Sequence, residues 1–194
     1  PQEESQLADV WSKYMPSDRY DCGNIDFCND GDKLHSIKTL EDFMSEKILL
    51  IDGHSILNRA FYGLPDLTNS EGKHTGAVYG FLNILFRTIE EEKPQYLTVA
   101  FDLKAPTFRH KMFEAYKGTR KPMPEELREQ VPLIKEMLTA MGVNVVTKEG
   151  YEADDILGTL ARKSEAAGME ATILSGDRDL LQLATDKVMI RLPK

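Results

Sequence analysis

From residue 47 onward, short apolar runs alternate with longer stretches of helical periodicity, and this alternation constrains the fold more than any other feature. Strands are predicted at residues 48–51, 96–101, 143–146, 171–174 and 188–191. Helices are predicted at residues 76–92, 125–141, 153–167 and 178–183. Such alternation is typical of parallel sheets. We therefore predict an α/β fold with a mostly parallel central sheet flanked by helices.

Residues 1–43 lack this pattern. They contain ten acids and four bases, a net charge of −6, and turn-forming runs such as residues 28–32. We predict an acidic, poorly ordered leader at 1–43 and one domain at 44–194. The formal net charge of the whole chain is −8, so only −2 belongs to the domain and DNA is not excluded as a partner. Cys22 and Cys28 have no zinc-ligand spacing and are expected to be free thiols.

No stretch approaches the ~18 consecutive apolar residues that a membrane span requires. The first residues also lack the basic and apolar regions of a signal peptide. We therefore expect no membrane association and a cytoplasmic location.

Carboxylates follow the predicted strands. Asp52 comes directly after the first strand and Asp102 directly after the second, while other acids follow the strands at 143–146 and 171–174. The carboxyl ends of parallel strands meet at one edge of a sheet, where ligand sites form. The sequence therefore predicts seven carboxylates at one rim: Asp52, Asp102, Glu152, Asp154, Asp155, Asp177 and Asp179.

Seven like charges in one crevice repel each other by several kcal/mol at the effective dielectric of protein sites, so the cluster is expected to bind cations. Oxygen ligands without paired His or Cys favour Mg²⁺ or Mn²⁺ over Zn²⁺. Mg²⁺ is commonly held by a few carboxylates together with substrate phosphate. The cluster therefore predicts metal-dependent phosphate chemistry.

Several of these acids also have an alternative interpretation, in which they stabilise local structure and bind no metal. Asp177 has the character of a helix N-cap, and Asp154 and Asp155 have that of first-turn acids that stabilise a helix dipole. Asp52-Gly53 has that of a tight turn. The metal hypothesis rests on the joint pattern, because four strand-to-helix junctions each present acid.

Residues 104–121 contain six bases and one acid, with aromatic residues between them. In single-strand-binding elements, cations follow the phosphates and rings stack on bases. The alternative is a solvated basic helix face. Lys117 and Arg120 are assigned a catalytic role at the scissile phosphate. The residues predicted to contact DNA are Lys104, Phe108, Arg109, Lys111, Phe113, Tyr116 and Lys121.

Seven runs of the sequence occur in a specific order: LIDGH at 50–54, TGAVYGF at 75–81, FD at 101–102, FR at 108–109, YKGTR at 116–120, GYEADD at 150–155 and SGDRDL at 175–180. In this order they resemble the 5′–3′ exonuclease domain of bacterial DNA polymerase I, over about residues 47–194. GYEADD followed by GDxD is the most specific part of the signature.

The resemblance implies a PIN-like 5′-nuclease fold in which the seven acids hold two divalent metals. It also implies that residues 104–121 belong to a helical arch through which a 5′ single-stranded flap passes. The expected activity is metal-dependent 5′–3′ exonuclease or flap-endonuclease cleavage of DNA, with RNA–DNA primer junctions as further substrates, in replication and repair.

Two features depart from the family pattern. The leader at 1–43 has no counterpart, and the chain stops before a further aspartate pair and a C-terminal helical hairpin. A C-terminal polymerase domain is therefore expected in the full-length protein. Two alternatives remain open: a PIN-type ribonuclease, and a non-catalytic nucleic-acid-binding module of the same fold.

Overall fold

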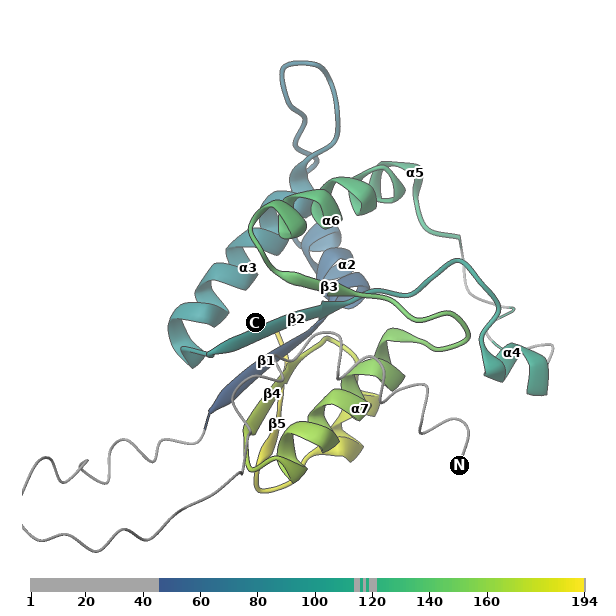
Figure 1. Cartoon of the computed structure of the whole chain (residues 1–194). Helices are drawn as coiled ribbons and strands as arrows, with labels where there is room; N and C mark the ends of the chain where they lie inside the picture. Colours follow the sequence, from purple (N-terminus) through teal and green to yellow (C-terminus); the bar gives the residue numbers. More distant parts are fainter. Residues whose placement is uncertain (1–45, 114–115, 117, 119–121, 194) are drawn as a thin grey trace, which may run out of the picture. The chain divides into compact units, whose positions relative to one another are not determined.

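The computed structural model describes residues 46–113, 116, 118 and 122–193. Its centre is a five-stranded sheet in which every strand pairs in parallel with its neighbours, in the order β3-β2-β1-β4-β5 (Figure 1). The predicted leader at 1–43 and the side chains of Lys117, Arg120 and Lys121 lie outside the described residues. The predicted parallel α/β architecture is confirmed.

The strands are short, and the three central ones are mostly apolar and buried, whereas the two edge strands are more exposed. β1 in particular is flanked on both sides, by β2 and by β4. Such continuous apolar runs are expected where both faces of a parallel sheet are covered. The strands are β1 (Lys47–Asp52), β2 (Tyr96–Ala100), β3 (Asn144–Val146), β4 (Glu170–Leu174) and β5 (Val188–Arg191).

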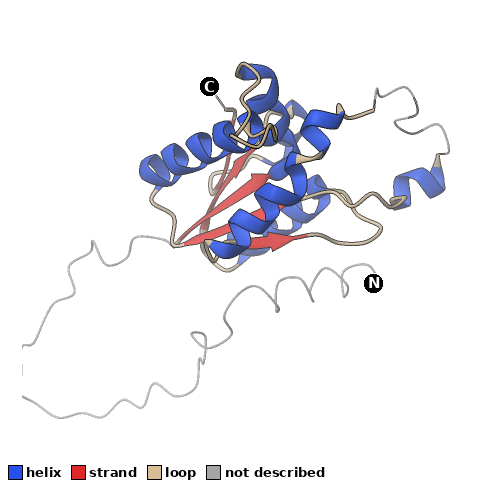
Figure 2. Cartoon of the chain, turned by 90° about the horizontal axis from the view of Figure 1, so that it is seen from above, coloured by secondary structure: helices blue, strands red, loops and turns tan. Residues whose placement is uncertain are grey.

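Helices cover both faces of the sheet (Figures 1 and 2). On one face lie α2 (Gly53–Gly63), α3 (Gly76–Glu92) and α6 (Gln130–Ala140), the last preceded by the single turn α5 (Glu125–Arg128). On the other face α7 (Ala153–Ala166) packs against β1 and β4. The remaining elements are the short helix α4 (Phe108–Met112) and the 3₁₀ helix η3 (Arg178–Leu183).

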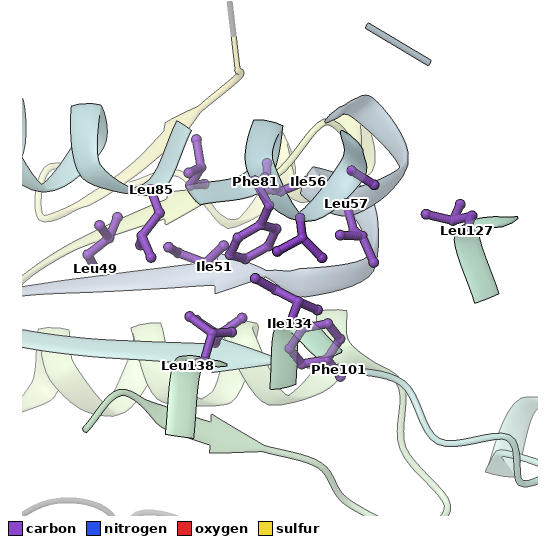
Figure 3. Close-up of a cluster of buried hydrophobic side chains, with 14 residues drawn as sticks. Leu49, Ile51, Ile56, Leu57, Phe81, Leu85, Phe101, Leu127, Ile134 and Leu138 are labelled. Atoms are coloured by element: carbon purple, nitrogen blue, oxygen red, sulfur yellow. The ribbon is translucent and has the colours of Figure 1, made fainter. Parts of the chain in front are cut away.

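The core under α2, α3 and α6 is built from alternate residues of the central strands. Leu49 and Ile51 of β1 point to this face and meet Phe81 of α3 and Ile134 of α6 (Figure 3). All four side chains are at most 1% exposed. Burying one such side chain stabilises the fold by about 1.5–3 kcal/mol relative to leaving it in water. This core fixes the position of the strand ends.

Three details differ from the prediction. The helix α2 was not predicted, because glycines at both ends and an Asp-Gly start are typical of a turn. The predicted helix at 125–141 is divided at Glu129 into α5 and α6. The helix α4 lies inside the predicted basic segment. No helix in the described part of the chain is long and apolar enough to cross a membrane.

Candidate active site

A cavity of about 260 Å³ lies at the carboxyl ends of the strands. Six of the seven predicted acids line it, and the seventh, Asp155, does not. No lysine or arginine occurs among the lining residues that the structure describes. The lining residues are Asp52, Ser55, Asn58, Asp102, Tyr116, Glu152, Ala153, Asp154, Asp177 and Asp179.

Asp52 is the last residue of β1 and the N-cap of α2. Its carboxylate accepts hydrogen bonds from the Ser55 amide at 3.0 Å and from the Ser175 hydroxyl at 2.9 Å. Burial raises the pKa of Asp52 above its ordinary value of 3.8, and the negative charges of Asp102 and Asp177 raise it further, whereas the two hydrogen bonds lower it. The charge of Asp52 is therefore destabilised by burial and by its acidic neighbours, as expected for a cation site.

The loops after β1 and β4 are held together at the cavity. Besides the Ser175–Asp52 bond, the Gly176 amide donates to the Ser55 hydroxyl at 2.8 Å. Gly53 has no room for a side chain, because a Cβ there would overlap the Phe101 ring. Glycine therefore lets α2 start directly against the end of β2.

Asp102 connects β2 to the start of α7, since its carboxylate accepts the Ala153 amide at 2.6 Å. The Asp102 amide donates to Nδ1 of His54 at 3.2 Å, and the His54 ring meets Phe101 edge-on at 5.3 Å between centroids. Burial lowers the pKa of His54, although Asp102 acts in the opposite direction. A neutral His54 then serves as a hydrogen-bond acceptor behind Asp102.

Glu152 is the N-cap of α7, in a capping box with Asp155. Its carboxylate lies in the cavity, where it accepts the Tyr116 hydroxyl at 3.1 Å. Tyr116 was predicted to contact DNA, and the structure places it in the wall of the acidic cavity. Neither Ser55, Asn58 nor Tyr116 was predicted as a wall residue.

Asp155 does not line the cavity and pairs with Arg109 of α4. Its two carboxylate oxygens accept from the two terminal nitrogens of the guanidinium at 2.6 and 2.7 Å. This bidentate pair raises the pKa of Arg109. Arg109 also lies 3.5 Å from the Glu152 carboxylate. Six of the predicted ligands thus line the cavity, and the seventh, Asp155, is bound to Arg109.

Asp177 and Asp179 enter the cavity from the start of η3. The Asp177 carboxylate accepts the Asp179 amide at 2.9 Å, so Asp177 is an N-cap. Asp52, Glu152 and Asp177 each begin a helix, and all three line the same cavity. The structural and functional interpretations of these acids are therefore compatible rather than alternatives.

The predicted DNA-contacting residues differ in exposure. Lys104, Lys111 and Phe113 are exposed, with Phe113 at 64%. Phe108 instead packs near Tyr151, at 5.9 Å between ring centroids, and supports the Arg109 guanidinium. Lys104, Lys111 and Phe113 are therefore more accessible to a ligand than Phe108 and Arg109.

The donor set fits a hard divalent cation, because six carboxylates line one cavity and no lysine or arginine is among its described lining residues. Among the described residues, no three His, Cys, Asp or Glu side chains lie close enough together to hold one ion directly. Mg²⁺ keeps several of its waters in proteins, so carboxylates can also hold it through water. The chemistry of the wall therefore fits a hydrated Mg²⁺ or Mn²⁺ ion.

Comparison with known families gives one match over most of the chain. The profile of the family described as "5′-3′ exonuclease, N-terminal resolvase-like domain" matches residues 47–193. DNA polymerase I of Bacillus subtilis is 50% identical over 149 residues, which are 77% of this chain and 17% of that protein. The thermostable DNA polymerase I of Thermus thermophilus is 45% identical over 148 residues, 76% of this chain and 18% of that protein. The chain spans less than a fifth of these relatives.

Solved structures of bacteriophage T5 proteins share the fold. The T5 5′-exonuclease with bound zinc aligns with a TM-score of 0.57 at 18% identity, over 76% of this chain and 55% of that one. A T5 flap endonuclease complex with DNA and metal ions aligns with a TM-score of 0.59 at 22% identity, with the same two coverages. These similarities show that the sheet and helices have a 5′-nuclease arrangement.

Proposed function

From the premise that the chain belongs to the 5′–3′ exonuclease family, we propose that it hydrolyses DNA phosphodiester bonds with the help of divalent cations. One observation carries the proposal. Carboxylates from four strand-to-helix junctions line a single cavity at the carboxyl edge of a parallel sheet. Ligand sites form at this edge in open α/β sheets.

Asp52, Asp102, Glu152, Asp154, Asp177 and Asp179 would hold Mg²⁺ or Mn²⁺, directly or through water. Two bound ions would supply charge stabilisation for the attacking and leaving oxygens of a phosphodiester. Asp52 and Asp102 are held in place by amide and hydroxyl donors, so the protein meets the cation with oriented oxygens. The carboxylates act in this proposal as ligands and not as proton donors or acceptors.

The basic segment at 104–121 would bring the polyanionic strand to the acidic cavity. Lys104 and Lys111 present exposed charges, and Phe113 presents an exposed ring. Cations bind the sugar-phosphate backbone irrespective of sequence, and aromatic rings stack on unpaired bases. Lys117, Arg120 and Lys121 belong to the same basic segment, with Lys117 and Arg120 assigned to the scissile phosphate.

The relatives named DNA polymerase I suggest the biological setting. We propose that the chain forms the N-terminal nuclease part of a DNA polymerase I, with a polymerase domain following it. Its substrates would be 5′ flaps and RNA–DNA primer junctions, in replication and repair in the bacterial cytoplasm. The T5 flap endonuclease crystallised with DNA supports the choice of a flap substrate.

Incubation of the purified chain with a 5′-flap DNA duplex tests the proposal. We expect cleavage with Mg²⁺ or Mn²⁺ and none with a chelator, and slower cleavage of a matched flap made wholly of RNA in an RNA duplex. Preference for the RNA duplex would favour a PIN-type ribonuclease. Tight DNA binding without metal-dependent cleavage would favour a non-catalytic binding module.

A further inference from the structure

The basic segment at 104–121 begins with residues that the structure describes. Two of them contact the loop before α7 and the first turn of α7. The Phe108 amide donates to the Gly150 carbonyl at 3.0 Å, and the Phe108 ring approaches Tyr151. The next residue, Arg109, reaches the first turn of α7. Two consecutive residues of α4 therefore contact the same short stretch of chain.

Arg109 and Asp155 make the strongest of these contacts. Their bidentate pair uses both carboxylate oxygens, at 2.6 and 2.7 Å. One of these oxygens also accepts the Glu152 amide at 3.0 Å. The guanidinium carbon lies 4.5 Å from the centre of the Phe108 ring, so a cation–π contact also holds Arg109 in place. Planar bidentate geometry is specific to arginine and cannot be reproduced by lysine.

Burial and position set Asp155 apart from its neighbour Asp154. The Asp155 side chain is 17% exposed and that of Arg109 is 32% exposed, so the pair is partly shielded from water. Asp154 lines the acidic cavity and Asp155 does not. Adjacent residues of a helix point about 100° apart, which is how two consecutive acids can serve two different surfaces.

We propose that Arg109 and Asp155 form a clamp that fixes the base of the basic segment against the first turn of α7. Asp155 is then a positioning residue, and cation binding belongs to the six acids of the cavity wall. Arg109 is likewise a positioning residue rather than a phosphate contact. This assignment revises the ligand role predicted for Asp155 and the DNA-contact role predicted for Arg109.

The clamp has a consequence for the cavity, which rests on the proposed function. Tyr116, seven residues after Arg109, donates its hydroxyl to Glu152 in the cavity wall. By fixing Arg109 beside Glu152, the clamp holds the segment where Tyr116 reaches the acidic cavity. A strand bound to the segment is thereby delivered to the carboxylates.

Cation binding without DNA tests the role of Asp155. We expect Asp155→Asn, which keeps an oxygen to accept the Glu152 amide, to weaken Mn²⁺ binding, measured by electron paramagnetic resonance, much less than loss of a cavity acid does, because the Asp155 carboxylate is outside the cavity wall. The matched variant Asp154→Asn should weaken Mn²⁺ binding by about tenfold or more. Equal weakening in both variants would show that Asp155 is a ligand and would overturn the inference. Failure of the parent chain to bind Mn²⁺ would instead count against the proposed function.

A double-mutant cycle tests the clamp independently of metal and activity. Arg109→Gln and Asp155→Asn should each speed tryptic cleavage after Lys111 by about tenfold, since each breaks the same charge-assisted bonds. The double variant should be cleaved no faster than either single variant, because the pair is already broken. Multiplication of the two effects would show that the residues act separately and would overturn the clamp. Circular dichroism confirms that each variant is folded before cleavage is measured.

The salt dependence of DNA binding separates a clamp from a phosphate contact. Arg109→Gln should leave the slope of log binding constant against log salt unchanged, since its charge is used by Asp155. Lys111→Gln, an exposed base on the same helix, should reduce that slope by about one. An equal reduction of the slope in both variants would show that Arg109 contacts phosphate and would overturn its role as a positioning residue.

Discussion

The acids of this domain fall into two regions with opposite kinds of partner. At the end of α3, Glu91 and Glu92 both pair with Arg191 of β5, and Arg87 reaches Glu91 at 2.8 Å. At the carboxyl edge of the sheet, Asp52 and Asp102 receive amide and hydroxyl hydrogen bonds instead. Amide and hydroxyl donors orient a carboxylate without cancelling its charge. Asp52 and Asp102 are therefore held in position while their charge stays available to a cation.

The largest effect is expected when a cavity acid loses its charge. Asp102→Asn keeps the shape and the oxygen that accepts the Ala153 amide, but it removes one charge from the cation site. We expect flap cleavage to fall by about 100-fold or more, while DNA binding persists or strengthens because one repulsive charge is gone.

Single-turnover cleavage and equilibrium DNA binding measure these two effects separately. The matched control is Glu91→Gln, which removes a charge from the paired acids of α3 and should leave the cleavage rate unchanged. Near-normal cleavage by Asp102→Asn would contradict the metal-site assignment and, with it, the contrast between the two regions.

A smaller loss is expected from the basic segment. Lys117→Ala and Arg120→Ala should each slow flap cleavage by about tenfold and reduce the salt slope by about one, because the proposed function assigns each cation to phosphate. Rates measured over a series of salt concentrations provide both quantities. If neither rate nor slope changes, the segment is a solvated basic surface.

Removing the charge of Asp52 should increase the stability of the fold, although it removes a proposed cation ligand. Its folded-state pKa is raised above 3.8, so the ionised side chain destabilises the fold, and this cost disappears as the pH falls and the carboxyl is protonated. In a chelator at neutral pH, Asp52→Asn should raise the Tm by roughly 2–4 °C, the shift that about 1 kcal/mol gives in a protein of this size.

The pH dependence of that gain is its check. The difference in Tm between Asp52→Asn and the parent chain should shrink as the pH is lowered toward 3.8, since the parent Asp52 then becomes neutral too. Thermal unfolding followed by circular dichroism at several pH values measures it. A gain that does not depend on pH would show that the charge of the buried carboxylate is not its cause.

The smallest effect is expected where the acids already have basic partners. Glu91→Gln should lower the Tm by no more than roughly 2 °C, because partly exposed ion pairs contribute about 0–1 kcal/mol and Arg191 retains Glu92. Differential scanning calorimetry resolves a change of this size. A rise in Tm like that of Asp52→Asn would mean that the two regions do not differ in the way proposed.

The strands and the longer helices could be predicted from the sequence because apolar periodicity follows directly from burial. The helix at 76–92 and the 3₁₀ helix at 178–183 have the predicted bounds. The helix α2 escaped prediction because its stability comes from packing Ile56 and Leu57 into the core, which local propensity does not reveal. The Asp52 cap on the Ser55 amide was the one local signal of its start.

The sequence predicted the acids of the cavity wall, but it did not predict the other wall residues Ser55, Asn58 and Tyr116. Parallel strands bring their ends together, so the acids that follow them were expected to converge. Which of two consecutive acids faces the cavity depends on the exact rotation of α7, and the sequence did not separate Asp154 from Asp155. The Arg109–Asp155 pair joins residues 46 positions apart, a contact that a local pattern cannot indicate.

The strand order has a consequence for folding of the chain during its synthesis on the ribosome. β1 is the first strand to be made and the middle strand of the sheet, and its partner β4 comes much later: Ser175 and Asp52, bonded across this boundary, are 123 positions apart. At translation rates of 5–20 residues per second, roughly 6–25 s pass before β4 emerges. Nascent chains stalled before and after β4 should therefore differ in protease protection of β1. Until β4 is made, the backbone N–H and C=O groups on one edge of β1 have no native partner strand. A chaperone that shields this edge has seconds in which to act.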